Sequence, residues 1–469
     1  MTTTRTSLAW ISCALSALVV SINLTVMSVA FDSLRRDFPG TELSVMGWVL
    51  SVYTIVFGAL LVPAGRLADH LGRRTIFLWG LGIMSVSSTV AGLAPAVWLI
   101  ILGRVGQGAA AACLVPSTMG LLLEAVPVEQ RVTVTAFYSL LASVGGIAGP
   151  TVGALLIQES TWRAAFFIAP VLAVLSFITG FRSLPETKRA RSGPLPDVLG
   201  SVLVVMSLSA FSLGILQSRD WGWADARTIG ALALAVAAGL AFWRRSSVHP
   251  VPVLPMKLTR IRSFALANIA SLLYGASTGA LLFGTVLFLR EVWDYDIVDA
   301  GLGLMPLAVS SLFTSWIGGR LGNRYGERAV AVPGSLIVAG GMAWLAWRVG
   351  AHPKFVRDWL PGGTLLGAGM GLAYPMIGSA GVRGVEGEDL SVASATNRMT
   401  LQIGNAVGIA LVIAILGDAT GHAMLDQMRI AWVVTAAIVL GAALTLALLD
   451  RPAHVANLAA QRAQVAASR

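Results

Sequence analysis

Long apolar stretches alternate with short polar connections along almost the whole chain. A membrane-spanning helix needs about 20 consecutive apolar residues. The pattern predicts fourteen such helices, near residues 9–30, 46–66, 76–94, 98–122, 133–157, 164–184, 197–217, 227–244, 263–290, 299–320, 329–349, 360–380, 397–417 and 429–449. The first stretch is long, lacks an obvious cleavage site and is followed by further spans, so it is interpreted as a helix and not as a signal peptide. The fold class predicted is an all-α integral membrane protein.

The composition supports a membrane protein. The chain has 469 residues, of which 56% are hydrophobic and 12% charged, and its mean hydropathy is +0.77. A soluble domain carries about 25% charged residues. This amount of apolar surface exceeds what a single core can bury, so lipid is the expected solvent.

The net charge of +10 is distributed unevenly over the connections. With the N-terminus inside, the connections on the cytoplasmic side are predominantly basic, above all residues 182–191 and 244–262, and those on the outer side are acidic in balance. Both termini are therefore predicted to be cytoplasmic, with the basic face toward anionic lipid headgroups. This distribution argues against a nucleic-acid partner. The predicted location is the plasma (inner) membrane of a bacterium. The strong preference for arginine over lysine, together with much alanine and glycine, indicates a GC-rich genome.

The spans group as six, two and six. Charged, proline-containing connections at residues 184–196 and 244–262 flank a helix pair that belongs to neither half. The predicted organisation is a six-helix bundle over 1–184, a linker with two extra helices over 185–262, a second six-helix bundle over 263–450 and a cytoplasmic tail over 451–469.

Residues suited to metal, disulfide or covalent chemistry are sparse. Cys13 and Cys113 lie separately in apolar stretches, and the five histidines have no ligand spacing. No nucleophile–base pair or phosphate loop is present either. The sequence therefore predicts neither an enzyme nor a bound metal or cofactor.

A charged turn of ten residues, 65–74, separates the second and third spans. Gly65 and Gly72 permit close helix approach and a tight turn, Asp69 can accept hydrogen bonds or pair with arginine, and Arg73 and Arg74 suit the inner membrane face. A weaker copy occupies residues 319–328, where Asn323 replaces the acid. The repeat indicates a duplicated membrane protein whose second turn latches less strongly.

Spans four and five carry two further motifs. Arg104 lies within an apolar span with Gln107 about one turn away, and a charged residue in a span usually faces the bundle interior. Gly145, Gly149 and Gly153 recur every four residues and predict a smooth surface for close helix packing, next to Pro150, which permits a kink.

These motifs, in this order, resemble those of the major facilitator superfamily, and specifically its fourteen-span drug:proton antiporter family. The resemblance extends to residues 162–163, 197–200, 300–306 and 397–408. It implies a major facilitator fold and the export of hydrophobic or amphipathic small molecules by alternating access, coupled to protons. It also implies a gating latch at 65–74, a role for Arg104 in substrate binding or proton coupling, and a monomer whose partners are its substrate and the bilayer.

The chain departs from that family in its first span. Where relatives carry an acid, this chain has Asn23, which cannot titrate. Asp32 lies nearer the outer end of the span, and Arg290 ends span nine where the family often has glutamine. Three interpretations remain open. Asp32 takes over proton coupling, or the substrate is anionic and meets a cavity made positive by Arg104 and Arg290, or the protein is a uniporter. A non-transporting sensor or scaffold is a further alternative.

Tyrosines within the spans are candidates for a cavity lining. Tyr53, Tyr274 and Tyr374 combine an aromatic ring with a polar hydroxyl, which suits an amphipathic ligand. Other aromatic residues are expected to form interface belts or lipid-facing surface.

Overall fold

The computed structural model describes residues 3–124, 131–185, 197–385, 389–417, 419 and 421–449, and over these residues it contains helices and turns but no strand. The helices are α1 (Thr3–Asp37), α2 (Leu43–Leu71), α3 (Arg73–Gly92), α4 (Val97–Glu124), α5 (Arg131–Glu159), α6 (Trp162–Ser183), α7 (Val198–Trp221), α8 (Ala226–Val248), α9 (Met256–Thr259), α10 (Arg262–Glu291), α11 (Ile297–Leu302), α12 (Met305–Tyr325), α13 (Glu327–Arg348), the π-helical turn η2 (Phe355–Trp359), α14 (Leu360–Val382), α15 (Asp389–Leu416) and α16 (Gly421–Ala447). Within the described residues, thirteen helices are long and apolar enough to cross a membrane. Helix α5 coincides with the remaining predicted span, residues 133–157.

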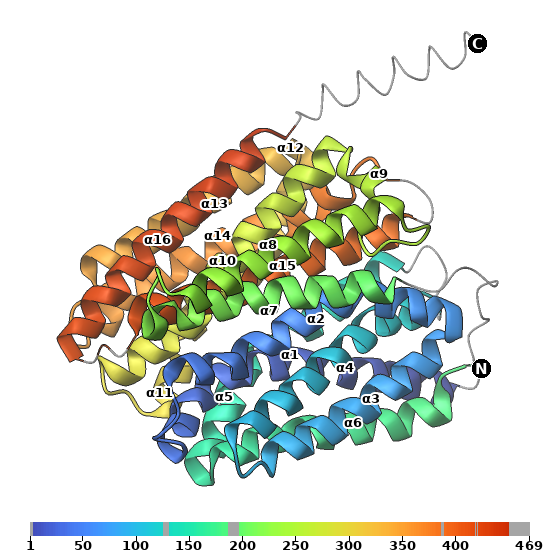
Figure 1. Cartoon of the computed structure of the whole chain (residues 1–469). Helices are drawn as coiled ribbons and strands as arrows, with labels where there is room; N and C mark the ends of the chain where they lie inside the picture. Colours follow the sequence, from blue (N-terminus) through green and yellow to red (C-terminus); the bar gives the residue numbers. More distant parts are fainter. Residues whose placement is uncertain are drawn as a thin grey trace.

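Figure 1 shows α1 to α6 as one group of helices and α10 to α16 as a second group. Helix α7 packs on α8 and also contacts α2 and α15, so the extra helix pair lies along the boundary between the groups. Asp197 accepts a 2.6 Å hydrogen bond from Arg245 and thereby joins the start of α7 to the end of α8. The domain division at residues 184 and 262 stays a prediction, and its tail, 451–469, lies outside the described residues.

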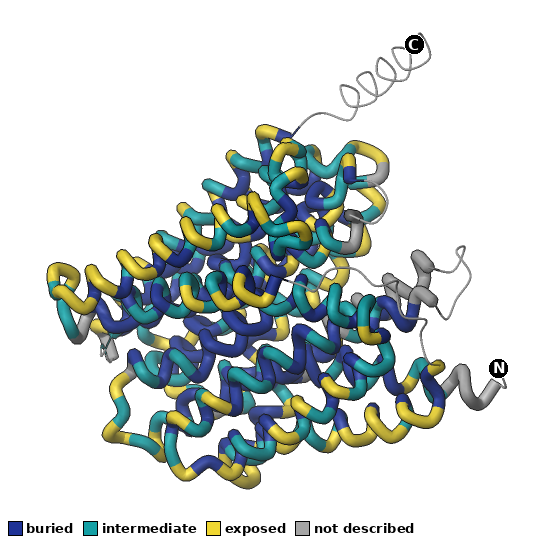
Figure 2. Tube along the Cα trace, turned by 45° about the vertical axis from the view of Figure 1, so that its right-hand side comes forward, coloured by how far each residue is buried: buried dark blue, intermediate teal, exposed yellow. Residues whose placement is uncertain are grey.

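Exposed and buried residues have the distribution expected for a protein in lipid. In Figure 2 the buried residues concentrate on the inner faces of the helices and the exposed ones on the outside. Many exposed residues are large and apolar, among them Trp79, Leu240 and Leu444, which are 69%, 66% and 71% exposed. In a bilayer such side chains contact hydrocarbon chains, so their exposure does not raise the free energy of the folded protein.

The segment 65–74 is almost entirely helical, which corrects its prediction as a turn of ten residues. Helix α2 continues to Leu71, and α3 begins at Arg73. The reversal takes place at Gly72, whose φ of 105° suits glycine. The second copy repeats this arrangement at Gly326, with φ of 84°, between α12 and α13. We call the side of the molecule that carries the first turn the Asp69 end, and the opposite side the Asp32 end.

The predicted span 299–320 is one of these thirteen, over Val298–Gly322, but its helix is interrupted between α11 and α12 at Gly303 and Leu304. Pro306 has no N–H, so a continuous helix would leave the carbonyl of Leu302 without its donor. The indole of Trp359 donates a 3.0 Å hydrogen bond to the carbonyl of Gly303 at the break. Spanning proteins tolerate such breaks where neighbouring groups satisfy the freed backbone.

Glycines allow two pairs of helices to touch. The stripe of Gly145, Gly149 and Gly153 on α5 faces α1, where an added Cβ would meet the side chains of Ser21, Thr25 and Val26. In the second group, Gly275 and Gly279 of α10 face Gly404 and Gly408 of α15. Here an added Cβ would meet backbone atoms, so the backbones of the two helices are in direct contact.

We expect Gly404→Ala to destabilise the protein by about 1–3 kcal/mol, since its new methyl group would overlap the carbonyl oxygen of Leu272 and overpacking costs this much. Gly378→Ala is the matched control, because no atom lies within 4 Å of its added Cβ. Thermal unfolding of the two purified variants measures the difference. Equal melting temperatures would show that α10 and α15 can separate freely.

Candidate transport site

The guanidinium of Arg104 is buried among helices α1, α2 and α4. Its side chain is 1% exposed. Nε donates to the carbonyl of Val49 at 2.8 Å, and Nη1 donates to Oδ1 of Asn23 at 2.6 Å and to Oε1 of Gln107 at 2.9 Å. The guanidinium also lies 4.3 Å from the ring centroid of Tyr53, a cation–π distance. A buried cation is thus held by neutral oxygens and an aromatic face.

Asn23 occupies the centre of this network. Besides accepting from Arg104, its Nδ2 donates to the sulfur of Met84 at 3.8 Å. Gln107 extends the network to α3, because its amide donates to Ser88 at 2.8 Å. An asparagine neither binds nor releases a proton here. The network therefore joins α1 to α4 without an acidic member.

A second charged cluster joins the two helix groups at the Asp32 end. Arg290 of α10 donates to Oδ2 of Asp32 on α1 through Nη2 at 2.7 Å and Nε at 3.2 Å. Arg36 reaches the same oxygen at 3.0 Å, and the carboxyl of Glu291 lies close enough to Asp32 for the two charges to influence each other. Asp32 and Arg290 have side chains that are 7% and 12% exposed, so water screens their attraction weakly.

Aromatic and small residues complete the contact at the Asp32 end. The rings of Phe31 on α1 and Phe283 on α10 meet edge to face, with centroids 5.0 Å apart. Gly301 of α11 approaches the carbonyl of Pro150 on α5, since an added Cβ would lie 3.4 Å from that oxygen. The two groups therefore touch through α1–α10 and α5–α11 at this end.

The groups also touch through α2 and α15, whose contact runs from Gly47 and Ile413 near the Asp32 end to the Asp69 end. An added Cβ on Gly58 of α2 would lie 3.2 Å from both Cβ of Gln402 and the carbonyl oxygen of Met399. A cavity of about 80 Å³ near this crossing is lined by Asp69 and Arg73 from the turn and by Val392 and Ala395 from α15. The predicted gating turn thus lies next to the boundary between the groups.

The charged residues of the turn hold α2, α3, α4 and α6 together. Asp69 accepts from Arg73 at 2.9 Å across the reversal at Gly72. Arg73 lies over Gly120 of α4, where an added Cβ would meet its guanidinium. Arg74 donates to the carbonyl of Phe181 on α6 at 2.9 Å. An added Cβ on Gly65 would lie 3.4 Å from Pro116 of α4.

The second copy of the turn has an acid that the sequence comparison overlooked. Glu327, at the position equivalent to Arg73, forms an ion pair with Arg383 at the end of α14 and accepts from Ser379 at 3.0 Å. Position 323, where the first turn has its acid, carries Asn323. The signal that identifies Glu327 is an acidic residue displaced by one helical turn from that position.

The resemblance implies a gating latch at this turn. On that basis we expect Asp69→Asn to slow transport about threefold to tenfold while substrate affinity changes little, since the residue borders the boundary between the groups. Initial rates over a range of dye concentrations separate the two parameters. Asp426→Asn is the control, because Asp426 is 73% exposed and forms an ion pair within α16. A collapse of affinity with an unchanged maximal rate would contradict a gating role.

The tyrosines proposed as a cavity lining lie within the bundle. Tyr53 is fully buried beneath Arg104. Tyr274 is 1% exposed and shares a 3.1 Å hydrogen bond with Ser335. Its ring meets that of Tyr374 edge to face at 6.1 Å. Tyr274 and Tyr374 thus form an aromatic pair between α10 and α14, whereas Tyr53 is part of the Arg104 network.

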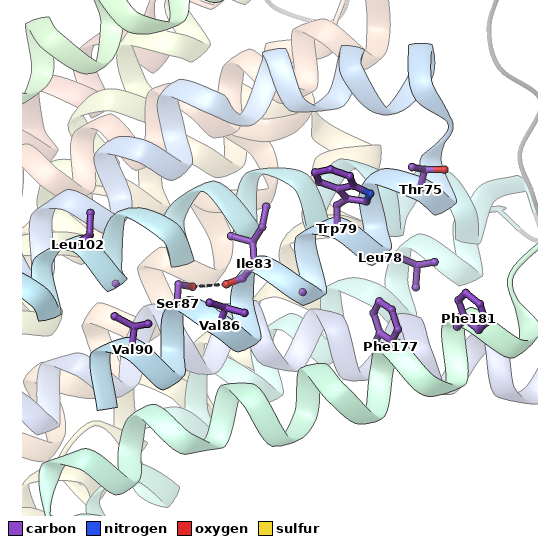
Figure 3. A pocket seen from close by; sticks show the side chains of 12 residues that line it. Thr75, Leu78, Trp79, Ile83, Val86, Ser87, Val90, Leu102, Phe177 and Phe181 are labelled. Atoms are coloured by element: carbon purple, nitrogen blue, oxygen red, sulfur yellow. Dashed lines mark hydrogen bonds between the residues drawn. The ribbon is translucent and has the colours of Figure 1, made fainter. Parts of the chain in front are cut away.

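A large apolar groove lies on the outside of the first group. It has a volume of about 770 Å³ and is lined by α3, α4 and α6, with Trp79, Ile83 and Phe177 among its walls (Figure 3). Trp79 and Leu102 are 69% and 56% exposed. Since the groove opens away from the second group, it suits a lipid chain better than a compound passing between the groups.

These features define a polytopic membrane protein with two helix groups in contact at both ends and a polar, aromatic interior. That is the architecture of a secondary transporter. The sequence profile of the Major Facilitator Superfamily matches residues 10–379, and the chain belongs to this family of transporters. It is accordingly a transporter of small molecules and not an enzyme.

Characterised relatives include bacterial export proteins. The chain is 28% identical to the tetracenomycin C resistance and export protein of Streptomyces glaucescens, over 88% of this chain and 76% of the relative. It is 29% identical to the cephamycin export protein CmcT of Amycolatopsis lactamdurans, over 89% and 86%. The multidrug transporter protein MdtP of Bacillus subtilis is 25% identical, over 86% and 74%. These relatives confirm the resemblance to fourteen-span drug exporters.

A solved structure supports the fold. The crystal structure of the human organic anion transporter MFSD10 (TETRAN) superposes with a TM-score of 0.63 and 16% sequence identity, covering 95% of this chain and all of that one. At this identity the likeness concerns the fold alone.

Proposed function

We propose that this protein exports hydrophobic or amphipathic small molecules, drugs or secondary metabolites, by alternating access as a monomer in a bacterial plasma membrane. The two groups would separate at one end while they close at the other. The export proteins among its relatives support the direction of transport. The basic connections support an orientation with the Asp69 end in the cytoplasm.

We propose further that protons drive this export through Asp32. The Arg104 network holds neutral Asn23 where the family has an acid, so proton exchange there has no carrier. Asp32 in contrast is a carboxylate that pairs with Arg290 across the boundary between the groups. A proton bound there would remove most of the attraction and lower the free energy needed to separate α1 from α10. This inter-group ion pair is the observation that carries the proposal.

Transport of ethidium into everted vesicles with an imposed pH gradient tests the function. We expect uptake that exceeds vector controls and collapses when an uncoupler dissipates the gradient. In intact expressing cells the same uncoupler should raise ethidium accumulation. Uptake that the uncoupler does not reduce would exclude proton-driven export and favour the uniporter alternative.

A further inference from the structure

Arg398 is an exposed charge inside a membrane span. The sequence pattern placed it at the start of a span, residues 397–417, but α15 begins at Asp389 and its apolar portion covers Val392–Leu416. Arg398 is therefore more than two turns inside the helix, yet its side chain is exposed. Among the described residues its guanidinium makes no hydrogen bond and no ion pair. A charge at this depth is costly unless it faces water or a ligand inside the bundle.

The surroundings of Arg398 place it between the two helix groups. The neighbours of Arg398 on α15 contact both groups, because an added Cβ on Gly58 of α2 would lie 3.2 Å from the carbonyl oxygen of Met399, and Asn397 donates to Ser271 of α10 at 2.7 Å. The charge of Arg398 also acts on the phenols of Tyr138 on α5 and Tyr374 on α14, which belong to different groups (Figure 1). Tyr138 is 4% exposed, and Tyr374 packs against Tyr274. Thus Arg398 lies on the segment of α15 that borders both groups, with phenols from both groups close enough for its charge to act on them.

Another unsatisfied polar group lies further along the same side of α15. Seven residues separate Asn405 from Arg398, which is about two helical turns or 10 Å along the axis. Asn405 is 8% exposed, and its Nδ2 donates to Gln402 at 2.7 Å. Its Oδ1 has no partner among the described residues. Buried polar atoms are normally satisfied, so this oxygen lacks a donor that the described chain does not supply.

The other two arginines considered for anion binding are already engaged. Arg104 is 1% exposed and enclosed by neutral oxygens. Arg290 pairs with Asp32. Arg398 differs from both, because it combines exposure with the absence of a described carboxylate partner.

We infer that Arg398 binds the anionic group of an aromatic substrate, with Tyr138 and Tyr374 beside it, an inference that rests on the proposed export function. A guanidinium matches a carboxylate in geometry and charge. The phenols offer hydroxyl donors and aromatic faces. Asn405 would accept a hydrogen bond from a donor about 10 Å from the anionic group. The preferred substrates are therefore organic acids with an extended aromatic body.

Binding of two fluorescent dyes to the full-length protein in detergent tests this inference. Carboxyfluorescein is the aromatic anion and ethidium the aromatic cation, and fluorescence anisotropy measures both affinities. We expect Arg398→Gln to weaken carboxyfluorescein binding at least about tenfold, equal to about 1.4 kcal/mol. Its affinity for ethidium should stay within about twofold of the wild-type affinity. Tyr374→Phe should weaken carboxyfluorescein binding about threefold. Arg227→Gln, on α8 outside both six-helix groups, should change neither.

The outcomes separate this inference from the proposed function. A wild-type protein that exports ethidium but does not bind carboxyfluorescein would overturn the anion site alone, as would Arg398→Gln with wild-type affinity. An equal loss of affinity for both dyes would assign Arg398 a structural role, which a lowered melting temperature of Arg398→Gln would reveal. Arg398→Lys keeps the charge and is expected to retain most carboxyfluorescein binding. A wild type that transports neither dye and binds neither would overturn export of such compounds itself.

Discussion

Arg104→Gln is expected to reduce export at least tenfold and to lower thermal stability markedly. The substitution removes the donors that reach Val49, Asn23 and Gln107. Each buried acceptor left without a partner costs about 1–3 kcal/mol. The loss weakens the hydrogen-bonded contact between α1, α2 and α4. The first group can move as a rigid body only if this contact stays intact. Ethidium uptake in everted vesicles and thermal unfolding of purified protein measure the two effects.

Arg104→Lys distinguishes the charge from the geometry of the hydrogen bonds. Lysine keeps the charge but lacks the planar fork that reaches acceptors on separate helices. We expect this variant to remain nearly as impaired as Arg104→Gln, whereas Arg163→Gln, at the partly exposed start of α6, should behave like wild type. Export at the wild-type rate by Arg104→Gln would show that the network is dispensable.

Most of the fold follows from hydropathy, because a bilayer imposes a simple rule on every span. Runs of about 20 apolar residues must be helices. The same rule cannot position helix ends in the polar connections, where charged residues continue the helical geometry. Helix α2 therefore extends to Leu71 and α15 begins at Asp389, both beyond the apolar runs. The break at Gly303 depends on Pro306 and on a donor from Trp359, which is distant in sequence.

The site was less predictable, because its decisive features are pairings between distant segments. The sequence singled out Asn23, Arg104 and Gln107, and these three lie together in one network. It singled out Asp32 and Arg290 separately, but their pairing depends on how α1 meets α10. Arg398 belongs to the segment 397–408 that resembles the family, but a span predicted to begin at residue 397 places it at the membrane surface, whereas the apolar portion of α15 begins at Val392.

Asp32→Asn is expected to reduce gradient-driven ethidium uptake at least tenfold while transport down an ethidium gradient continues. The amide cannot carry a proton, so the pH gradient loses its link to the separation of α1 from α10. It also leaves Arg290 without its counter-charge, and a hydrogen bond to a charged group contributes about 1.5–3 kcal/mol to stability. Everted vesicles with and without a pH gradient measure both modes. Asp299→Asn, an exposed acid at the same end, is the matched control.

A second substitution separates proton coupling from simple loss of the ion pair. Arg290→Gln in the Asp32→Asn background removes the buried unpaired cation, so we expect stability to recover, because the other partner of Asp32, Arg36, is 70% exposed and solvated. Coupling should stay lost, because the carboxylate is still absent. Recovery of gradient-driven uptake in the double variant would show that Asp32 serves the contact between α1 and α10 and that the proton binds elsewhere. Retained gradient-driven uptake in Asp32→Asn alone would exclude Asp32 as the proton carrier.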